Sequence, residues 1–203
     1  MEHHYTTIGK RSVAEYKEKG SKFIAIADVF NNAELLKEYL NEIQKQYPRA
    51  SHYCYAFSIG TGQNKFRYND DREPSGSAGK PIYGAILSAQ VTNVIVVVVR
   101  YFGGTQLGIP GLTQAYKTAA REALDLAGKR IEEMIVKFKV TFPIDFADVV
   151  LQAVKSRKGT LIHYKAEIPS AAVCEMGTEH YLALKQLFLN EHPFIGIVDL
   201  TEL

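Results

Sequence analysis

The chain has 203 residues, of which 46% are hydrophobic and 23% are charged, as in ordinary globular proteins. Its formal net charge of +2 gives no overall sign of nucleic-acid binding. The longest aliphatic run, Val94 to Val99, has six residues, whereas a membrane span needs about 20. We therefore expect no membrane association, and the length suits two small domains or one large one.

The charges are divided unevenly along the chain. Residues 1–130 carry 17 Lys and Arg against 12 Asp and Glu, whereas residues 131–203 carry 7 against 10. Net charges of +5 and −3 are typical of two domains with different surfaces, and they also arise by chance on a solvated surface.

The two cysteines, Cys54 and Cys174, are far apart and form no CxxC pattern, so a structural zinc site with about four ligands is not expected. The first ten residues, "MEHHYTTIGK", have no apolar core and do not resemble a signal peptide. We expect a cytoplasmic protein with reduced thiols.

Strand and helix patterns follow one another in the amino-terminal part of the chain. Alternation predicts a strand or hairpin around Gly20, and it places His52 and Cys54 on one face of a strand and Tyr53 and Tyr55 on the other. The elements expected up to residue 70 are a strand or hairpin at 14–30, a helix at 31–48, a strand at 50–60 and a short strand at 64–70.

A turn-rich loop at 70–80 leads to a short helix expected from Pro81, which is a favourable first helical residue. The unbroken β-branched run in 91–102 predicts a strand covered on both faces, at the centre of a sheet. A helix at 111–128 follows, with an alanine-rich apolar face that suits close packing and an outer face that carries Lys117 and Arg121.

Residues 128–130 mark the expected domain boundary, which gives domains at 1–128 and 129–203. Beyond it the patterns predict the order βαββαβ, which is typical of a ferredoxin-like domain. The elements are a strand at 131–142, a helix at 145–156, strands at 160–168 and 171–177, a helix at 179–191 and a strand at 194–201. No chemical motif stands out in this half.

The two glycine-rich segments, "PSGSAGK" and "GGTQLG", do not fit nucleotide-binding motifs. Pro81 follows Gly79-Lys80 where a P-loop requires Ser or Thr, and the glycines of the second segment are out of register for GxGxxG. Both segments precede a helix, whose amino terminus can offer free N–H groups and a positive dipole end to a phosphate.

Catalysis, metal binding and packing are the alternatives for these segments. His52 and Cys54 share a strand face and could form a nucleophile pair. Asp70, Asp71 and Glu73 could bind Mg²⁺. The glycines could also serve only to bring a helix close to the sheet.

Four ordered blocks, "SKFIA", "SHYCYAFSIG", "DDREPSGSAGKP" and "VVVVRYFGGTQLGIPGLTQAY", closely resemble the signature of the IMPACT family, in particular its YigZ-like bacterial members. The sequence departs from the family pattern at Arg72, where DDGEPSG has glycine, and at Pro110, where LGxGGL has glycine. Arg72 adds a charge that suits anion binding, and Pro110 removes one N–H donor.

The resemblance implies an α+β protein of two domains. The first would be a β-sheet with two helices on one face and a left-handed βαβ crossover, as in a domain of a small-subunit ribosomal protein. The second would be a ferredoxin-like domain resembling one of elongation factor G. No established reaction and no cofactor come with the resemblance, so an enzyme is the less favoured class.

The resemblance further implies a cytoplasmic protein that binds RNA or the ribosome and regulates translation. The residues expected to hold the anionic backbone are Arg72, Ser75, Gly76, Ser77, Lys80, Arg100, Gly103, Gly104, Lys117 and Arg121. One alternative is an enzyme that acts on a phosphorylated small molecule or nucleotide through His52, Asp70, Asp71 and Ser75. Another is an adaptor that contacts a translation-related protein.

Overall fold

The computed structural model describes residues 3–61 and 65–200, and the chain divides into two compact units. The first unit is Tyr5–Glu132, and the second contains the described residues from Glu133 onward together with His3 and His4. Within the described ranges, no helix is long and apolar enough to cross a membrane.

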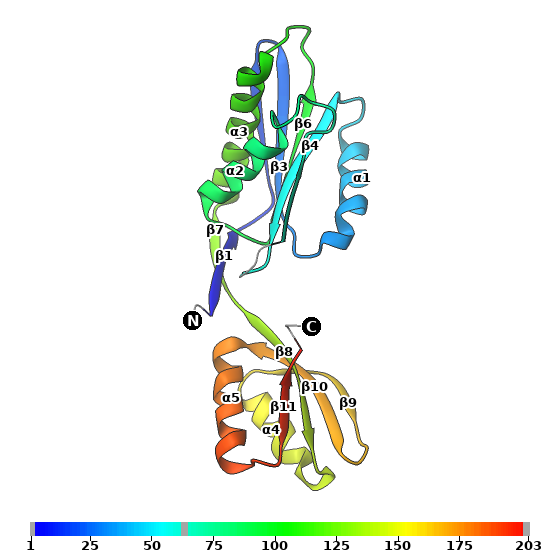
Figure 1. The fold of residues 1–203 in the computed structure, drawn as a ribbon, viewed down its shortest axis with the longest axis vertical. Coiled ribbons are helices and arrows are strands. Elements are labelled where there is room, and N and C mark those ends of the chain that lie inside the picture. The colour runs from blue at the N-terminus through cyan, green and yellow to red at the C-terminus, as the bar shows by residue number, and fades with distance from the viewer. Residues whose placement is uncertain (1–2, 62–64, 201–203) are drawn as a thin grey trace. The chain divides into compact units, whose positions relative to one another are not determined.

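A five-stranded sheet forms the centre of the first unit (Figure 1). Its strands in spatial order are β2 (Ser12–Glu18), β3 (Ser21–Val29), β6 (Val94–Tyr101), β4 (His52–Ile59) and β5 (Lys65–Asn69). Every neighbouring pair is antiparallel, so β5 and β6 run parallel with β4 between them. Helix α2 (Gly79–Ala89) connects these two strands and completes a βαβ crossover.

Helices cover both faces of this sheet (Figure 1). Helices α2 and α3 (Gly108–Ala127) pack on one face, against Val94, Val96 and Val98, and two helices on one face is the arrangement that the resemblance implied. Helix α1 (Leu36–Gln46), preceded by the short 3-10 helix Ala33–Leu35, packs on the other. The valine strand β6 lies at the centre with both faces buried, which confirms the prediction made from its unbroken β-branched run.

Helix α3 begins three residues earlier than its apolar pattern suggested. Pro110 lies in its first turn, where a missing N–H group breaks no helical hydrogen bond. The helix ends at Gly128, whose positive φ of 65° suits glycine. After it, β7 (Lys129–Glu133) pairs with β1 (His4–Ile8), a strand that the sequence did not predict.

The second unit has the predicted order βαββαβ. The elements are β8 (Ile135–Phe142), a 3-10 turn at Ile144–Phe146, α4 (Ala147–Ser156), β9 (Thr160–Lys165), β10 (Ser170–Gly177), α5 (Thr178–Glu191) and β11 (Gly196–Asp199). The sheet order is β11-β8-β10-β9 with antiparallel pairs, and both helices pack into a single core with one face of the sheet. This arrangement confirms the ferredoxin-like prediction.

Candidate functional site

The loop between β5 and α2 is organised around the carboxylate of Asp70. This carboxylate accepts backbone N–H groups from Gly76 at 2.9 Å, Ala78 at 3.0 Å and Gly79 at 2.8 Å. The donors at the start of α2, which the sequence suggested for a phosphate, are therefore engaged by a carboxylate of the chain itself. Ser77 is buried and donates to a backbone carbonyl of the same loop, while Ser75 is exposed.

A buried ion pair joins this loop to the central strand. Glu73 Oε1 accepts hydrogen bonds from Arg100 Nη1 at 2.6 Å and from the Tyr116 hydroxyl at 2.7 Å. The side chains of Arg100 and Glu73 are only 5% and 3% exposed. Arg100 was expected to contact an external anion, but its charge is compensated inside the protein and is not available at the surface.

The cluster continues to Cys54 without forming a nucleophile pair. Cys54 Sγ donates to the Asp70 carbonyl at 3.1 Å and lies 3.3 Å from the Tyr116 hydroxyl. Burial raises the pKa of the Cys54 thiol well above its ordinary value, which keeps the thiol protonated. His52 shares the strand face of Cys54, as predicted, but its Nδ1 lies 2.8 Å from the Asp71 carbonyl.

The metal alternative finds no support in the same loop. Across residues 3–61 and 65–200, no group of three or more His, Cys, Asp or Glu side chains is arranged to hold a metal ion. Asp70 is occupied by backbone donors, and Glu73 is paired with Arg100.

The glycines of the second segment bring backbone against backbone. A Cβ atom on Gly103 would lie 1.9 Å from the carbonyl carbon of Gly20, in the turn between β2 and β3. Ser21 Oγ accepts the Gly103 N–H at 3.2 Å and Arg100 Nη2 at 3.3 Å, which fixes this approach. Gly104 has a φ of 85°. Gly103 therefore has a packing role, whereas Gly104 adopts a left-handed conformation that favours glycine.

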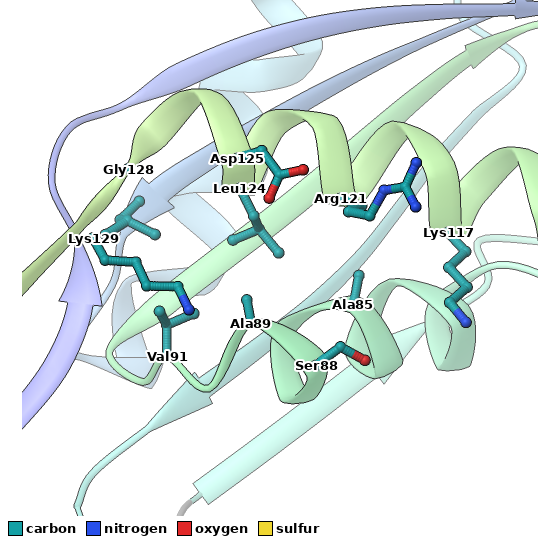
Figure 2. Close-up of a pocket in the computed structure, with 11 residues that line it drawn as sticks. Ala85, Ser88, Ala89, Val91, Lys117, Arg121, Leu124, Asp125, Gly128 and Lys129 are labelled. Atoms are coloured by element: carbon teal, nitrogen blue, oxygen red, sulfur yellow. The ribbon is translucent and has the colours of Figure 1, made fainter.

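A groove separates α2 from α3 on the helical face of the first unit (Figure 2). It encloses about 320 Å³, and its apolar lining includes Ala85, Ala89 and Leu124. Three cations line it, namely Lys117 and Arg121 of α3 and Lys129 of β7, together with one carboxylate, Asp125. In Figure 2, the Lys117 and Lys129 side chains extend toward α2 from different ends of the groove. We call this feature the α2–α3 groove.

The cations of the α2–α3 groove are exposed, and none of them has a salt-bridge partner in the described part of the chain. The structure thus separates the basic residues that the sequence grouped. Lys117 and Arg121 lie in the groove, Lys80 is exposed on α2, and Arg72 is exposed beside Asp71. Lys129 was not selected, although the segment "GKR" that begins at Gly128 is basic.

Comparison with known proteins matches this unit to a family. The model of the Impact N-terminal domain matches residues 19–124, which contain both signature loops and most of α3. The chain belongs to the IMPACT family. Membership confirms the resemblance seen in the sequence, and the matched segment carries the Glu73–Arg100 pair and two of the groove cations, Lys117 and Arg121.

Relatives within the IMPACT family are bacterial and eukaryotic. The IMPACT family member YvyE of Bacillus subtilis is 34% identical over 128 residues, which cover 63% of this chain and 59% of the relative. YigZ of Escherichia coli is 34% identical over 108 residues, which cover 52% of this chain and 53% of the relative. Each match thus spans less than two thirds of the relative's length. A crystal structure described as that of a hypothetical protein matches this fold over 100% of both chains, with a TM-score of 0.82 at 20% identity.

Proposed function

We propose that this IMPACT family protein binds RNA through the α2–α3 groove and acts in the regulation of translation. The observation that carries the proposal is the set of three exposed cations, Lys117, Arg121 and Lys129, which line one groove and have no salt-bridge partner among the described residues. Such cations bind phosphates by releasing condensed counterions, a sequence-independent source of affinity. The translational role is the one that the family resemblance implies.

The competing enzymatic function has less support. A thiol nucleophile needs a lowered pKa, whereas burial raises the pKa of Cys54. Both candidate acids of such an enzyme are engaged inside the protein, because Asp70 accepts backbone N–H groups of the loop and Asp71 Oδ2 accepts the Tyr53 N–H at 2.7 Å. The groove cations have no salt-bridge partner within residues 3–61 and 65–200, which favours an external anion.

The test is RNA binding by the full chain at several salt concentrations, with a charge reversal and a matched control. In Lys117→Glu/Arg121→Glu two groove cations become anions. In Lys37→Glu/Lys45→Glu the same change is made at exposed positions on α1, which covers the opposite face of the sheet.

We expect the groove variant to bind weakly and to lose about 0.7 in the slope of log affinity against log salt for each phosphate contact removed from a single strand. The α1 variant should bind RNA almost as well as the wild type. Equal affinities for the two variants would contradict the assignment of the groove.

A further inference from the structure

Three aromatic side chains form a stacked cluster at the edge of the first unit, on the opposite side of α2 from the groove. Phe66 and Tyr68 come from the edge strand β5, and Tyr83 comes from α2. The Phe66 and Tyr83 rings are nearly parallel, with centroids 4.7 Å apart and an interplanar angle of 14°. The Tyr68 and Tyr83 rings are 6.1 Å apart at 28°. We call these three residues the aromatic platform.

The register of the sheet explains why the platform forms. Tyr68 pairs with Ala56, whose side chain belongs to the core under α2 and α3, and Phe66 pairs with Ser58 two residues further along β4. Residues two apart on a strand share a face, so both rings project on the side of the sheet that carries α2. Tyr83 reaches them from the helix.

The platform is unusually open to solvent for a stacked cluster. Phe66 is 55% exposed and Tyr68 is 42% exposed, and all five residues of β5 are exposed. Leu87, one helical turn after Tyr83, is 56% exposed as well. A contiguous exposed apolar patch of this kind marks an interaction surface more often than an isolated exposed side chain does.

The charges around the platform select the kind of partner. On β5, Lys65 and Arg67 alternate with Phe66 and Tyr68 and therefore project from the other face of the sheet, whereas the segment Gly79–Ala89 of α2 contains one cation, Lys80, and no carboxylate. Lys80 lies one turn before Tyr83 on α2 and is exposed. Flat rings with an exposed cation beside them complement a ligand that combines flat π-systems with negative charge.

We propose that the aromatic platform stacks the unpaired bases of a single-stranded RNA, an inference that rests on the proposed RNA-binding function. Base–aromatic stacking needs unstacked bases, which single strands and loops present and regular duplexes do not. Phosphates next to the stacked bases are bound by Lys80 at the border of the platform.

The position of α2 relates the platform to the groove. Tyr83 and Ala85 are two residues apart, which puts them on roughly opposite sides of a helix with 3.6 residues per turn. Ala85 lines the α2–α3 groove, and Tyr83 belongs to the platform. One strand of RNA that crosses α2 therefore reaches phosphate-binding cations on one side of the helix and stacking rings on the other.

The experiment compares oligouridylate with an abasic ribose-phosphate oligomer of the same length and charge. The full chain is used as the wild type and as Phe66→Leu/Tyr68→Leu, which removes the π-faces but keeps apolar side chains. The control is Phe194→Leu in the second unit, where an aromatic side chain that is 50% exposed contacts the Phe146 ring edge-to-face, with ring centroids 4.6 Å apart.

We expect the platform variant to bind oligouridylate at least about fivefold more weakly than the wild type. This loss corresponds to the lower end of the range observed when one base–aromatic stacking contact is removed. Its affinity for the abasic oligomer should not change, because the phosphate contacts are intact. The Phe194→Leu variant should bind both oligomers as the wild type does.

A second variant tests the stacking directly. The chain contains no tryptophan, so Phe66→Trp introduces a single reporter into the platform while it keeps an aromatic face. Oligouridylate should quench its fluorescence at saturation, and the abasic oligomer should not. Unquenched fluorescence at saturating oligouridylate would overturn the platform.

The two proposals fail in different ways. If Lys117→Glu/Arg121→Glu abolishes RNA binding and Phe66→Leu/Tyr68→Leu leaves both affinities unchanged, the platform is wrong and the groove stands. If the platform variant loses oligouridylate binding and the groove variant does not, the groove is wrong and the platform stands. Equal loss on both oligomers in the platform variant overturns base stacking.

Discussion

Replacing Glu73 by glutamine would remove one charge from the centre of the signature cluster with almost no change in shape. Glutamine keeps an oxygen that can accept the hydrogen bonds of Arg100 and Tyr116, which lie 2.6 and 2.7 Å from Glu73 Oε1. The change therefore isolates the charge of the buried pair, because the variant leaves Arg100 positively charged in an interior where its side chain is 5% exposed.

The expected magnitude follows from this burial. Breaking a buried ion pair by removing one partner typically costs about 3–5 kcal/mol, because the other charge stays uncompensated. His52 Nε2, which lies 3.7 Å from Glu73 Oε1, cannot replace the lost negative charge. Since whole domains are stable by about 5–15 kcal/mol, Glu73→Gln should remove a large part of the free energy of unfolding of the first unit.

Urea unfolding followed by tyrosine fluorescence measures this loss. The chain has 12 tyrosines and no tryptophan, and among residues 133–203 only Tyr164 and Tyr181 contribute, so the signal reports mainly the first unit. The midpoint should fall while the slope stays the same. Glu15→Gln is the matched control, because the Glu15–Lys22 pair is 40% and 39% exposed and its loss should change the midpoint little.

The double variant Glu73→Gln/Arg100→Met completes the test. Removing both charges leaves no uncompensated ion, so the double variant should be more stable than Glu73→Gln alone. A Glu73→Gln variant that loses less than about 1 kcal/mol, or a double variant that is less stable than the single one, would refute the assignment of Glu73 as the counterion of Arg100.

Two further predictions concern the buried thiols and the glycines. Burial raises the pKa of both cysteine thiols, that of Cys174 from 9.0 to about 11, so neither Cys54 nor Cys174 should react rapidly with a disulfide reagent at pH 8 until the chain is unfolded. The folded state binds the thiol proton of Cys174 more tightly than the unfolded state does. The contribution of this proton to the free energy of unfolding is therefore complete below pH 9 and is lost as the pH rises toward 11. Urea midpoints on either side of pH 9 measure the loss. Gly103→Ala should destabilise the chain by more than about 1 kcal/mol because its Cβ atom would overlap the backbone of Gly20. Gly84 lies in the middle of α2, and a Cβ atom there would meet no atom within 4 Å, so Gly84→Ala should stabilise the chain by about 0.5–1 kcal/mol. A urea midpoint for Gly103→Ala equal to that of Gly84→Ala would contradict the packing role of Gly103.

Much of the fold was predictable because its signals are local. The β-branched run in 91–102, the alanine face of α3 and the turn at Gly20 each indicate an element within a few residues of sequence. The order βαββαβ of the second unit follows from the same kind of periodicity, and the structure confirms it.

Elements that depend on distant partners were missed or misplaced. Strand β1, "HYTTI", exists through pairing with β7, more than 120 residues later in the chain, and has little alternation of its own. Helix α2 begins at Gly79 rather than Pro81, because Asp70, nine residues earlier, accepts its first N–H groups. No residue next to the helix start carries that signal.

Residues of the candidate site were likewise predictable where the signal is local and misjudged where a distant partner decides. Lys117 and Arg121 were predicted because α3 is strongly amphipathic, and a helix places such residues outward. Arg100 was grouped with the anion-binding residues because it is a basic residue in a signature block, but the structure buries it against Glu73. Alternation along the strand could have predicted its burial, because Arg100 shares the face of Val98, which lies in the core under α3.

The buried cluster and the proposed binding surface are mechanically connected. Glu73 lies in the loop that leads into α2, and it accepts a hydrogen bond from Tyr116 of α3, so one carboxylate ties together the two helices that border the groove. Lys117 is the next residue after Tyr116, and its direction along the groove depends on how that turn of α3 is held. In the proposed RNA-binding function, the role that we infer for the signature residues 70–79 is therefore to fix the position of the groove cations.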